Sequence, residues 1–116
     1  MRDLFLWTAG IGAIAVALIH GVLGETKVFA RASIEPPRLR TLIRMCWQIG
    51  TVGWICGGVL LLATPSIDSS SARHWIIITM CAMYSFGMIG NFWIFRGRHF
   101  GWALLGGVIT MAIVGY

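Results

Sequence analysis

The residues most suited to chemistry are the few ionisable, amide and aromatic side chains that interrupt long apolar runs. Two of them are histidines, which can bind a metal ion or haem iron when a nearby carboxylate or amide orients the imidazole. The polar members lie near one common edge of the predicted helices, within about 10 Å of it at a helical rise of ~1.5 Å per residue. The candidate ligand-binding residues are His20, Glu25, Trp47, Gln48, Asn91, His99 and Trp102.

Two interpretations of these residues are open at the level of sequence. Ionisable side chains inside a membrane segment usually mark a functional site, so the set could hold a lipid-, quinone- or haem-type ligand. Alternatively the residues are structural, because helix ends are hydrated and Gln48 could hydrogen-bond to a neighbouring helix, which contributes about 0.6 kcal/mol on average. We predict no cofactor and no metal site, and keep haem or a metal ion as an alternative.

Patterns that would support catalysis are missing from the sequence. The chain has no H-E-x-x-H motif, no phosphate-binding glycine loop and no recognisable Ser-His-Asp arrangement. Its three cysteines, Cys46, Cys56 and Cys81, lie in apolar runs without C-x-x-C spacing. Such cysteines are typically buried and inert, and do not indicate a disulfide framework or a zinc site. We therefore predict that the protein is not an enzyme.

The composition indicates a membrane protein. Apolar residues make up 58% of the chain and charged residues 11%, whereas roughly a quarter of the residues in soluble domains are charged. So few charges cannot cover the surface of a small soluble fold, but lipid can solvate an apolar exterior. The net charge of +5 fits basic loops that contact anionic headgroups. We predict the lipid bilayer as a partner, and no nucleic acid.

Four apolar segments predict four transmembrane helices, at about residues 4–23, 42–63, 75–95 and 100–116. A span needs ~20 apolar residues, so the first three are long enough and the fourth is short. Pro36 and Pro37 break any helix in the first connection, and the stretch from Asp68 to Ser71 can cap the third helix. The predicted fold is all-α, an antiparallel four-helix transmembrane bundle in which residues 1–116 form a single integral membrane domain.

The basic residues predict the orientation of this bundle. Seven of the nine Lys and Arg residues lie in or beside the first and third connections, residues 24–41 and 96–99. Because basic loops stay on the cytoplasmic side, we predict that both connections are cytoplasmic and both termini non-cytoplasmic, in the inner (plasma) membrane. The candidate ligand-binding residues then lie near the cytoplasmic edge.

Small residues predict where the helices approach one another. In lipid, helices associate through close backbone packing at Gly and Ala rather than through the hydrophobic effect. The predicted packing residues are Ala13, Ala17 and Gly21 on the first helix and Gly50, Gly53 and Gly57 on the second. We expect them to pack within the bundle, with self-association or docking to other membrane subunits as alternatives.

Three short motifs give the chain a family resemblance. They are His20 with Gly24, the pair Trp47-Gln48, and the run His99-Phe100-Gly101-Trp102. The pattern resembles a group of uncharacterised small four-helix bacterial membrane proteins, which have histidine after the tryptophan of helix two and His-Pro-Gln-Trp before helix four. The resemblance implies a four-helix membrane fold but no particular activity. Because Gln48 replaces the second histidine, a three-histidine metal site is not expected here.

These observations lead to one functional prediction and two alternatives. We predict a non-catalytic accessory or interaction subunit of a larger membrane assembly, because the chain has small-residue faces and no charged pathway across the membrane. The first alternative is a binder of a lipid-, quinone- or haem-type ligand at the inner-leaflet polar residues. The second is a small transporter that acts as an oligomer.

Overall fold

The structure is a computed structural model that describes residues 1–116 and contains helices but no strands. Three helices are long and apolar enough to cross a membrane, and the fourth is a shorter apolar helix. This confirms the predicted all-α fold with four helices. The helices are α1 (Arg2–Leu23), α2 (Pro37–Ala63), α3 (Ser70–Phe95) and α4 (Gly101–Val114), with a π-helical segment (Gly24–Phe29) after α1 and a 3-10 turn (Thr64–Ser66) after α2.

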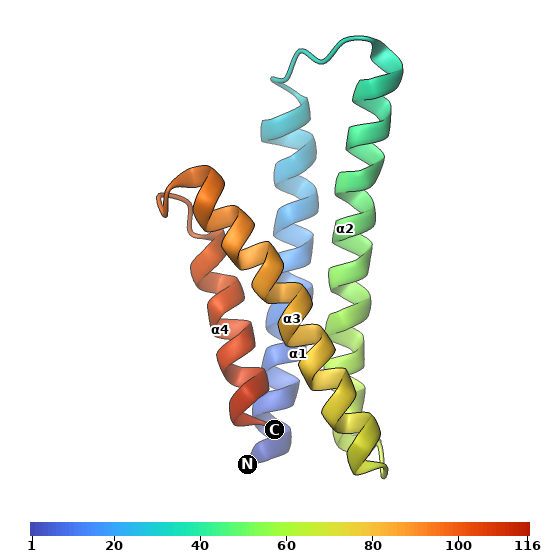
Figure 1. Cartoon of the computed structure of the whole chain (residues 1–116), viewed down its shortest axis with the longest axis vertical. Helices are drawn as coiled ribbons and strands as arrows, with labels where there is room; N and C mark the ends of the chain where they lie inside the picture. The colour runs from blue at the N-terminus through green and yellow to red at the C-terminus, as the bar shows by residue number, and fades with distance from the viewer.

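The helices form two antiparallel pairs (Figure 1). In the first pair, α1 and α2 run side by side; in the second, α3 crosses the first pair obliquely and α4 returns beside α1. The two chain ends lie together at one end of the molecule, where the Arg2 guanidinium donates a hydrogen bond to the Tyr116 carbonyl oxygen. The connections between α1 and α2 and between α3 and α4 therefore lie toward the opposite end.

The first connection is shorter than predicted. The π-helical segment continues α1 to Phe29, and α2 begins at Pro37, so little of the region from 24 to 41 is loop. Proline favours the first position of a helix because its fixed φ is already helical and its missing N–H needs no partner there. Pro37 thus starts a helix, whereas we expected it only to break one.

The third helix begins where its capping residues predict. Its N-cap is Ser69, whose hydroxyl accepts a hydrogen bond from the Ala72 amide at 3.3 Å. An N-cap oxygen satisfies one of the amides that the first turn leaves unpaired. This confirms a cap within the predicted stretch from 68 to 71, and it starts α3 five residues before the predicted boundary at 75.

The tightest helix crossing joins α1 to α2. A Cβ atom added at Gly10 would lie 2.7 Å from the Gly58 carbonyl oxygen, and one at Gly58 would lie 2.8 Å from the Gly10 carbonyl oxygen. The two backbones therefore touch, which only glycine at both positions allows. The predicted packing residues of α1, Ala13, Ala17 and Gly21, are buried along the same helix.

Of the packing residues predicted on α2, Gly57 faces a neighbouring helix within the bundle, whereas Gly50 and Gly53 do not. A Cβ atom at Gly57 would lie 2.6 Å from the Tyr84 hydroxyl, whereas Gly50 and Gly53 have no neighbour within 4 Å of that position. The reason is the oblique path of α3, which contacts α2 around Gly57 and then diverges from it toward α4 (Figure 1). The preceding turns of α2 consequently have no helix facing these two glycines.

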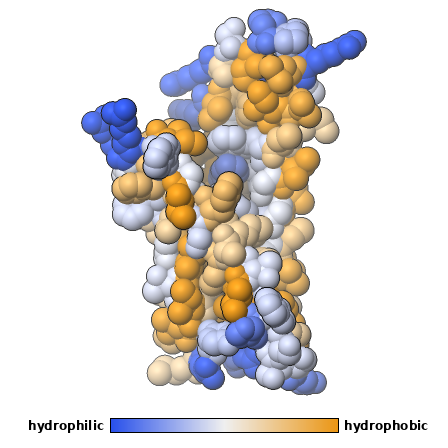
Figure 2. Space-filling view, viewed as in Figure 1, coloured by the Kyte–Doolittle hydropathy of each residue, from blue (hydrophilic) through white to orange (hydrophobic).

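Hydrophilic residues gather at the two ends of the long axis and at the connection between α3 and α4 (Figure 2). The surface between them is mainly apolar or intermediate in hydropathy. The α3–α4 connection turns through two left-handed residues, Arg96 with φ 50° and Gly97 with φ 72°. This tight turn places His99 directly before α4, beside the last turns of α3.

Candidate ligand-binding site

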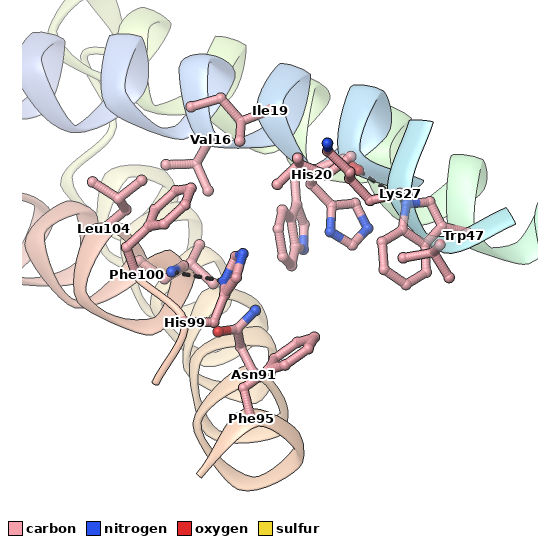
Figure 3. Close-up of a pocket in the computed structure, with 15 residues that line it drawn as sticks. Val16, Ile19, His20, Lys27, Trp47, Asn91, Phe95, His99, Phe100 and Leu104 are labelled. Carbon is pink, nitrogen blue, oxygen red and sulfur yellow. Dashed lines mark hydrogen bonds between the residues drawn. The ribbon is translucent and has the colours of Figure 1, made fainter. Parts of the chain in front are cut away.

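A cavity of about 340 Å³ lies between α1 and the hairpin of α3 and α4. Four of the seven predicted site residues line it: His20, Trp47, Asn91 and His99. Figure 3 shows His20 on α1 and His99 on the α3–α4 connection, on opposite sides of the cavity. Residues far apart in the sequence thus meet because α3 diverges from α2 and brings the hairpin over α1.

His20 is held between two indole rings. Its imidazole stacks on Trp47, with ring centroids 4.2 Å apart and planes inclined by 2°, and contacts the tilted ring of Trp54 at 4.7 Å. The Trp47 indole N–H donates to the His20 carbonyl oxygen at 3.0 Å. These contacts fix the position of the His20 ring without using either of its nitrogens, which remain available to a ligand.

Gly24 and the π-helical segment make room for Trp47. A Cβ atom at Gly24 would lie 2.7 Å from Cδ1 of Trp47, so any larger residue would displace the indole. A π-helical turn widens the backbone locally, and such turns are frequent at functional sites. The motif His20-x-x-x-Gly24 therefore has a structural meaning: Gly24 admits the tryptophan that stacks on His20.

Trp54 is fixed from the opposite side by α3. The Tyr84 side chain is fully buried, and its hydroxyl donates to the Trp54 carbonyl oxygen at 3.0 Å. A Cβ atom at Gly87 would lie 2.5 Å from Cζ2 of Trp54, so glycine at that position lets the indole reach the cavity. Trp54, which is not among the predicted site residues, thus forms part of the cavity wall.

The hydrogen bond that His99 makes fixes its tautomer. Its Nδ1 accepts a hydrogen bond from the Gly101 amide at 3.1 Å, at the start of α4. In the neutral ring, a nitrogen that accepts leaves the proton on the other nitrogen. Nε2 therefore carries the ring proton and is a hydrogen-bond donor. Phe100 stacks against the same ring at 4.5 Å and keeps it oriented.

Asn91 contains the one buried side-chain polar atom without a hydrogen-bond partner, its carbonyl oxygen Oδ1. Leaving such a group unpaired costs about 1–3 kcal/mol. The amide lies against Gly101, where an added Cβ atom would be 2.9 Å from Nδ2 of Asn91 and 3.0 Å from Nδ1 of His99. Asn91 and His99 are thus neighbours on the same side of the cavity (Figure 3).

The predicted site residues Glu25 and Gln48 do not line the cavity. Glu25 pairs with Arg44 at 2.6 Å and accepts a hydrogen bond from Nε2 of Gln48 at 2.7 Å. Gln48 also donates to the Gly21 carbonyl oxygen at 3.3 Å. This network ties the π-helical segment to α2, which is the kind of contact that the structural interpretation expects of these two residues.

Trp102 also lies outside the cavity lining. Its indole N–H donates to the Gly97 carbonyl oxygen at 3.1 Å, and its ring meets Phe92 edge-on at 5.5 Å. These contacts close the turn between α3 and α4. Trp102 therefore positions the segment that carries His99 and does not itself face the cavity.

Eleven of the 15 residues that line the cavity were not predicted as site residues, among them Lys27, Trp54, Phe95 and Phe100. A signal for two of them was present in the sequence. Lys27 follows His20, and Trp54 follows Trp47, by two helical turns, which places each pair on one face of a helix. Phe95 and Phe100 carry no such signal, because they reach the cavity only through the path of α3 and its turn.

The cavity has few side chains of the types that bind metal ions. Two imidazoles line it, and the chain brings no three His, Cys, Asp or Glu side chains together. Protein metal sites generally need three or four such ligands. Comparisons with protein families, with curated proteins and with solved structures found no match to this chain.

Proposed function

We propose that this protein binds a planar, hydrogen-bonding molecule of the quinone or quinol type, taken from the bilayer into the cavity between α1 and the α3–α4 hairpin. The observation that carries the proposal is the cavity lined by His20, Asn91 and His99, where the buried Oδ1 of Asn91 has no hydrogen-bond partner. A buried polar atom without a partner in a native fold needs an explanation, and a bound ligand is one. The role is binding, without catalysis.

The walls of the cavity favour a flat ring. Aromatic side chains prefer stacked or edge-on contacts with other rings, and small-molecule sites generally combine apolar walls with a few placed polar groups. The aromatic residues that line this cavity are His20, Trp47, Trp54, Phe95, His99 and Phe100.

The polar groups favour a ring that bears a hydroxyl. Oδ1 of Asn91 lacks a hydrogen-bond donor, and Nε2–H of His99 can donate to an acceptor. A quinol hydroxyl can donate or accept, whereas a quinone carbonyl can only accept. The reduced form of such a ligand should therefore bind more tightly than the oxidised form.

The proposed setting is the inner (plasma) membrane, with the basic connections 24–41 and 96–99 on the cytoplasmic side. Three helices have the length and composition to cross a membrane, and the excess of Lys and Arg in those connections supports this orientation. The cavity then lies toward the cytoplasmic edge, within reach of molecules dissolved in that leaflet.

The test is a binding measurement with a ring that has no tail. Duroquinol and duroquinone are titrated anaerobically into the purified protein in detergent, with isothermal titration calorimetry as the readout. Wild type should bind duroquinol more tightly than duroquinone. Asn91→Leu should weaken duroquinol binding about tenfold, as expected for one lost hydrogen bond to a buried group.

The control is Thr79→Val, which removes an exposed polar group elsewhere on α3 and should bind as wild type does. Equal duroquinol affinity in wild type and Asn91→Leu would contradict the assignment of Asn91 to the site. No binding of either ring to wild type would refute the proposed function.

A second candidate role, as an accessory or self-associating membrane subunit, rests on the open face of α2. Gly50 and Gly53 contact no other helix, and Cys46 is exposed one helical turn before Gly50. Small residues at this spacing let a further helix approach closely. Oxidation in liposomes should cross-link two copies through Cys46, and Gly53→Leu should suppress the cross-link. Unchanged cross-linking in that variant would remove this role for the face.

A further inference from the structure

An apolar groove leads away from the cavity along α1 and α4. It has a volume of about 290 Å³ and is lined by Thr8, Gly12, Ala15, Gly107 and Met111, among others. Three further lining residues, Val16, Ile19 and Leu104, belong to both the groove and the cavity. The two spaces are therefore adjacent. Figure 3 shows the shared residues together at one end of the cavity, away from Lys27 and Trp47.

We infer that the ligand carries a single apolar tail, which lies in this groove while the ring occupies the cavity. The inference rests on the proposed function, because it assigns the tail of the same ligand. The tail would run along α1 from Ile19 toward Thr8, which is a length of about 16 Å at ~1.5 Å per residue. That direction leads from the polar edge of the bundle into the predicted hydrocarbon region.

The groove offers hydrocarbon contacts and no free hydrogen-bond donor. Its only hydroxyl, on Thr8, already donates to the Leu4 carbonyl oxygen at 2.8 Å. Its volume is near the lower limit of small-molecule sites, which suits one chain and not the paired chains of a phospholipid. The occupant is therefore an isoprenoid or alkyl tail attached to the ring.

Two glycines keep the groove open. A Cβ atom at Gly12 would lie 3.3 Å from Cγ2 of Val108, and one at Gly107 would meet no atom within 4 Å. A leucine at Gly107 can therefore fill the groove without a clash in the protein. Gly90 on α3 is equally open but lines neither space, so Gly90→Leu is a matched control.

The experiment compares two reduced probes that share one ring: ubiquinol without a tail and decylubiquinol. Both are titrated into wild type, Gly107→Leu and Gly90→Leu in the same detergent. In wild type the decyl chain should strengthen binding about fivefold, a modest gain because packing contacts replace similar contacts with lipid or detergent. Gly107→Leu should abolish that gain but keep the affinity for the tail-less ring. The control Gly90→Leu should bind both probes as wild type does.

Ala15→Phe provides a second variant that fills the groove from α1, where Ala15 is exposed. It should also remove the gain from the decyl chain. If both variants keep the gain, the groove does not hold the tail, although the proposed function survives provided that the tail-less ring binds. If neither wild type nor any variant binds the tail-less ring, the proposed function itself fails. Equal weakening of both probes by Gly107→Leu would also overturn the tail assignment.

Discussion

The imidazole of His20 lies almost parallel to the indole of Trp47, with ring centroids 4.2 Å apart and planes inclined by 2°. Because Trp47 also donates its N–H to the His20 carbonyl oxygen, one residue of α2 fixes both the backbone and the side chain of one residue of α1. The indole covers one face of the imidazole, and Trp54 lies against the ring at a tilt. The nitrogens of His20 are thus left without a partner from the protein.

The first prediction concerns Trp47. Trp47→Phe removes the hydrogen bond and reduces the stacking surface, so the His20 ring should become less well ordered. An aromatic pair contributes about 0.5–1.5 kcal/mol, so duroquinol affinity should fall roughly three- to tenfold in the calorimetric titration. Trp93→Phe is the control, because Trp93 is 81% exposed. A variant that bound as tightly as wild type would show that the stack does not prepare the site.

The second prediction concerns Gly24, which lies beneath the same indole. Gly24→Ala would place a methyl group against Trp47, and overpacking of this kind costs about 1–3 kcal/mol. The free energy of unfolding, measured by titration with SDS in mixed micelles, should fall by that amount. Gly53→Ala should instead raise it by up to about 1 kcal/mol, because alanine favours the helix and meets no atom there. A gain in stability for Gly24→Ala would contradict the observed packing.

The number of helices could be predicted from the sequence, but the path of α3 could not. Apolar runs and loop chemistry identify four helices, and Ser69 caps the third as its residue type suggests. Hydropathy does not specify the crossing of α3 over the first pair, which depends on contacts such as that between Gly57 and Tyr84. For this reason the sequence did not indicate that Gly50 and Gly53, which lie beyond the crossing, have no neighbour within the bundle.

The same limit explains why only some of the predicted site residues line the cavity. The predicted depth in the membrane is similar for His20, Asn91, His99, Glu25 and Gln48. Depth does not indicate whether a side chain faces the space between α1 and α2 or the space between α1 and the α3–α4 hairpin. The ion pair between Glu25 and Arg44 draws Glu25 and Gln48 toward α2, whereas the cavity opens toward α3 and α4. The contact between Gly10 and Gly58 was likewise hidden, because many glycines in the chain look equivalent in sequence.

The third prediction separates stability from binding at Asn91. Asn91→Leu keeps a similar side-chain shape and removes the unpaired Oδ1. Without ligand, the free energy of unfolding should rise by about 1–2 kcal/mol, because a buried acceptor no longer lacks a donor. Duroquinol should then stabilise wild type more than the variant in the same SDS titration. If the variant were less stable than wild type without ligand, the unpaired oxygen would not destabilise the ligand-free protein.

The fourth prediction tests the contact between α1 and α2. Gly58→Ala would bring a methyl group to 2.8 Å from the Gly10 carbonyl oxygen, so the helices would have to separate along their crossing. The free energy of unfolding should fall by about 2–3 kcal/mol, measured in SDS titration. Gly50→Ala on the same helix is the control and should be neutral or stabilising, because Gly50 has no neighbour. Equal effects of both substitutions would show that propensity, and not the crossing, determines stability.

The fifth prediction concerns Glu25, a polar residue at the depth of the cavity that faces away from it. Glu25→Gln removes the charge that pairs with Arg44 at 2.6 Å but keeps an acceptor for Gln48. The midpoint of the SDS titration should shift slightly toward lower SDS, since the π-helical segment loses its ion pair to α2. Duroquinol affinity should stay within about twofold of wild type, because residues without shared contacts act independently. A large loss of affinity in Glu25→Gln, similar to that in Asn91→Leu, would contradict this placement. The ligand would then bind against α2, at a site that includes Gln48.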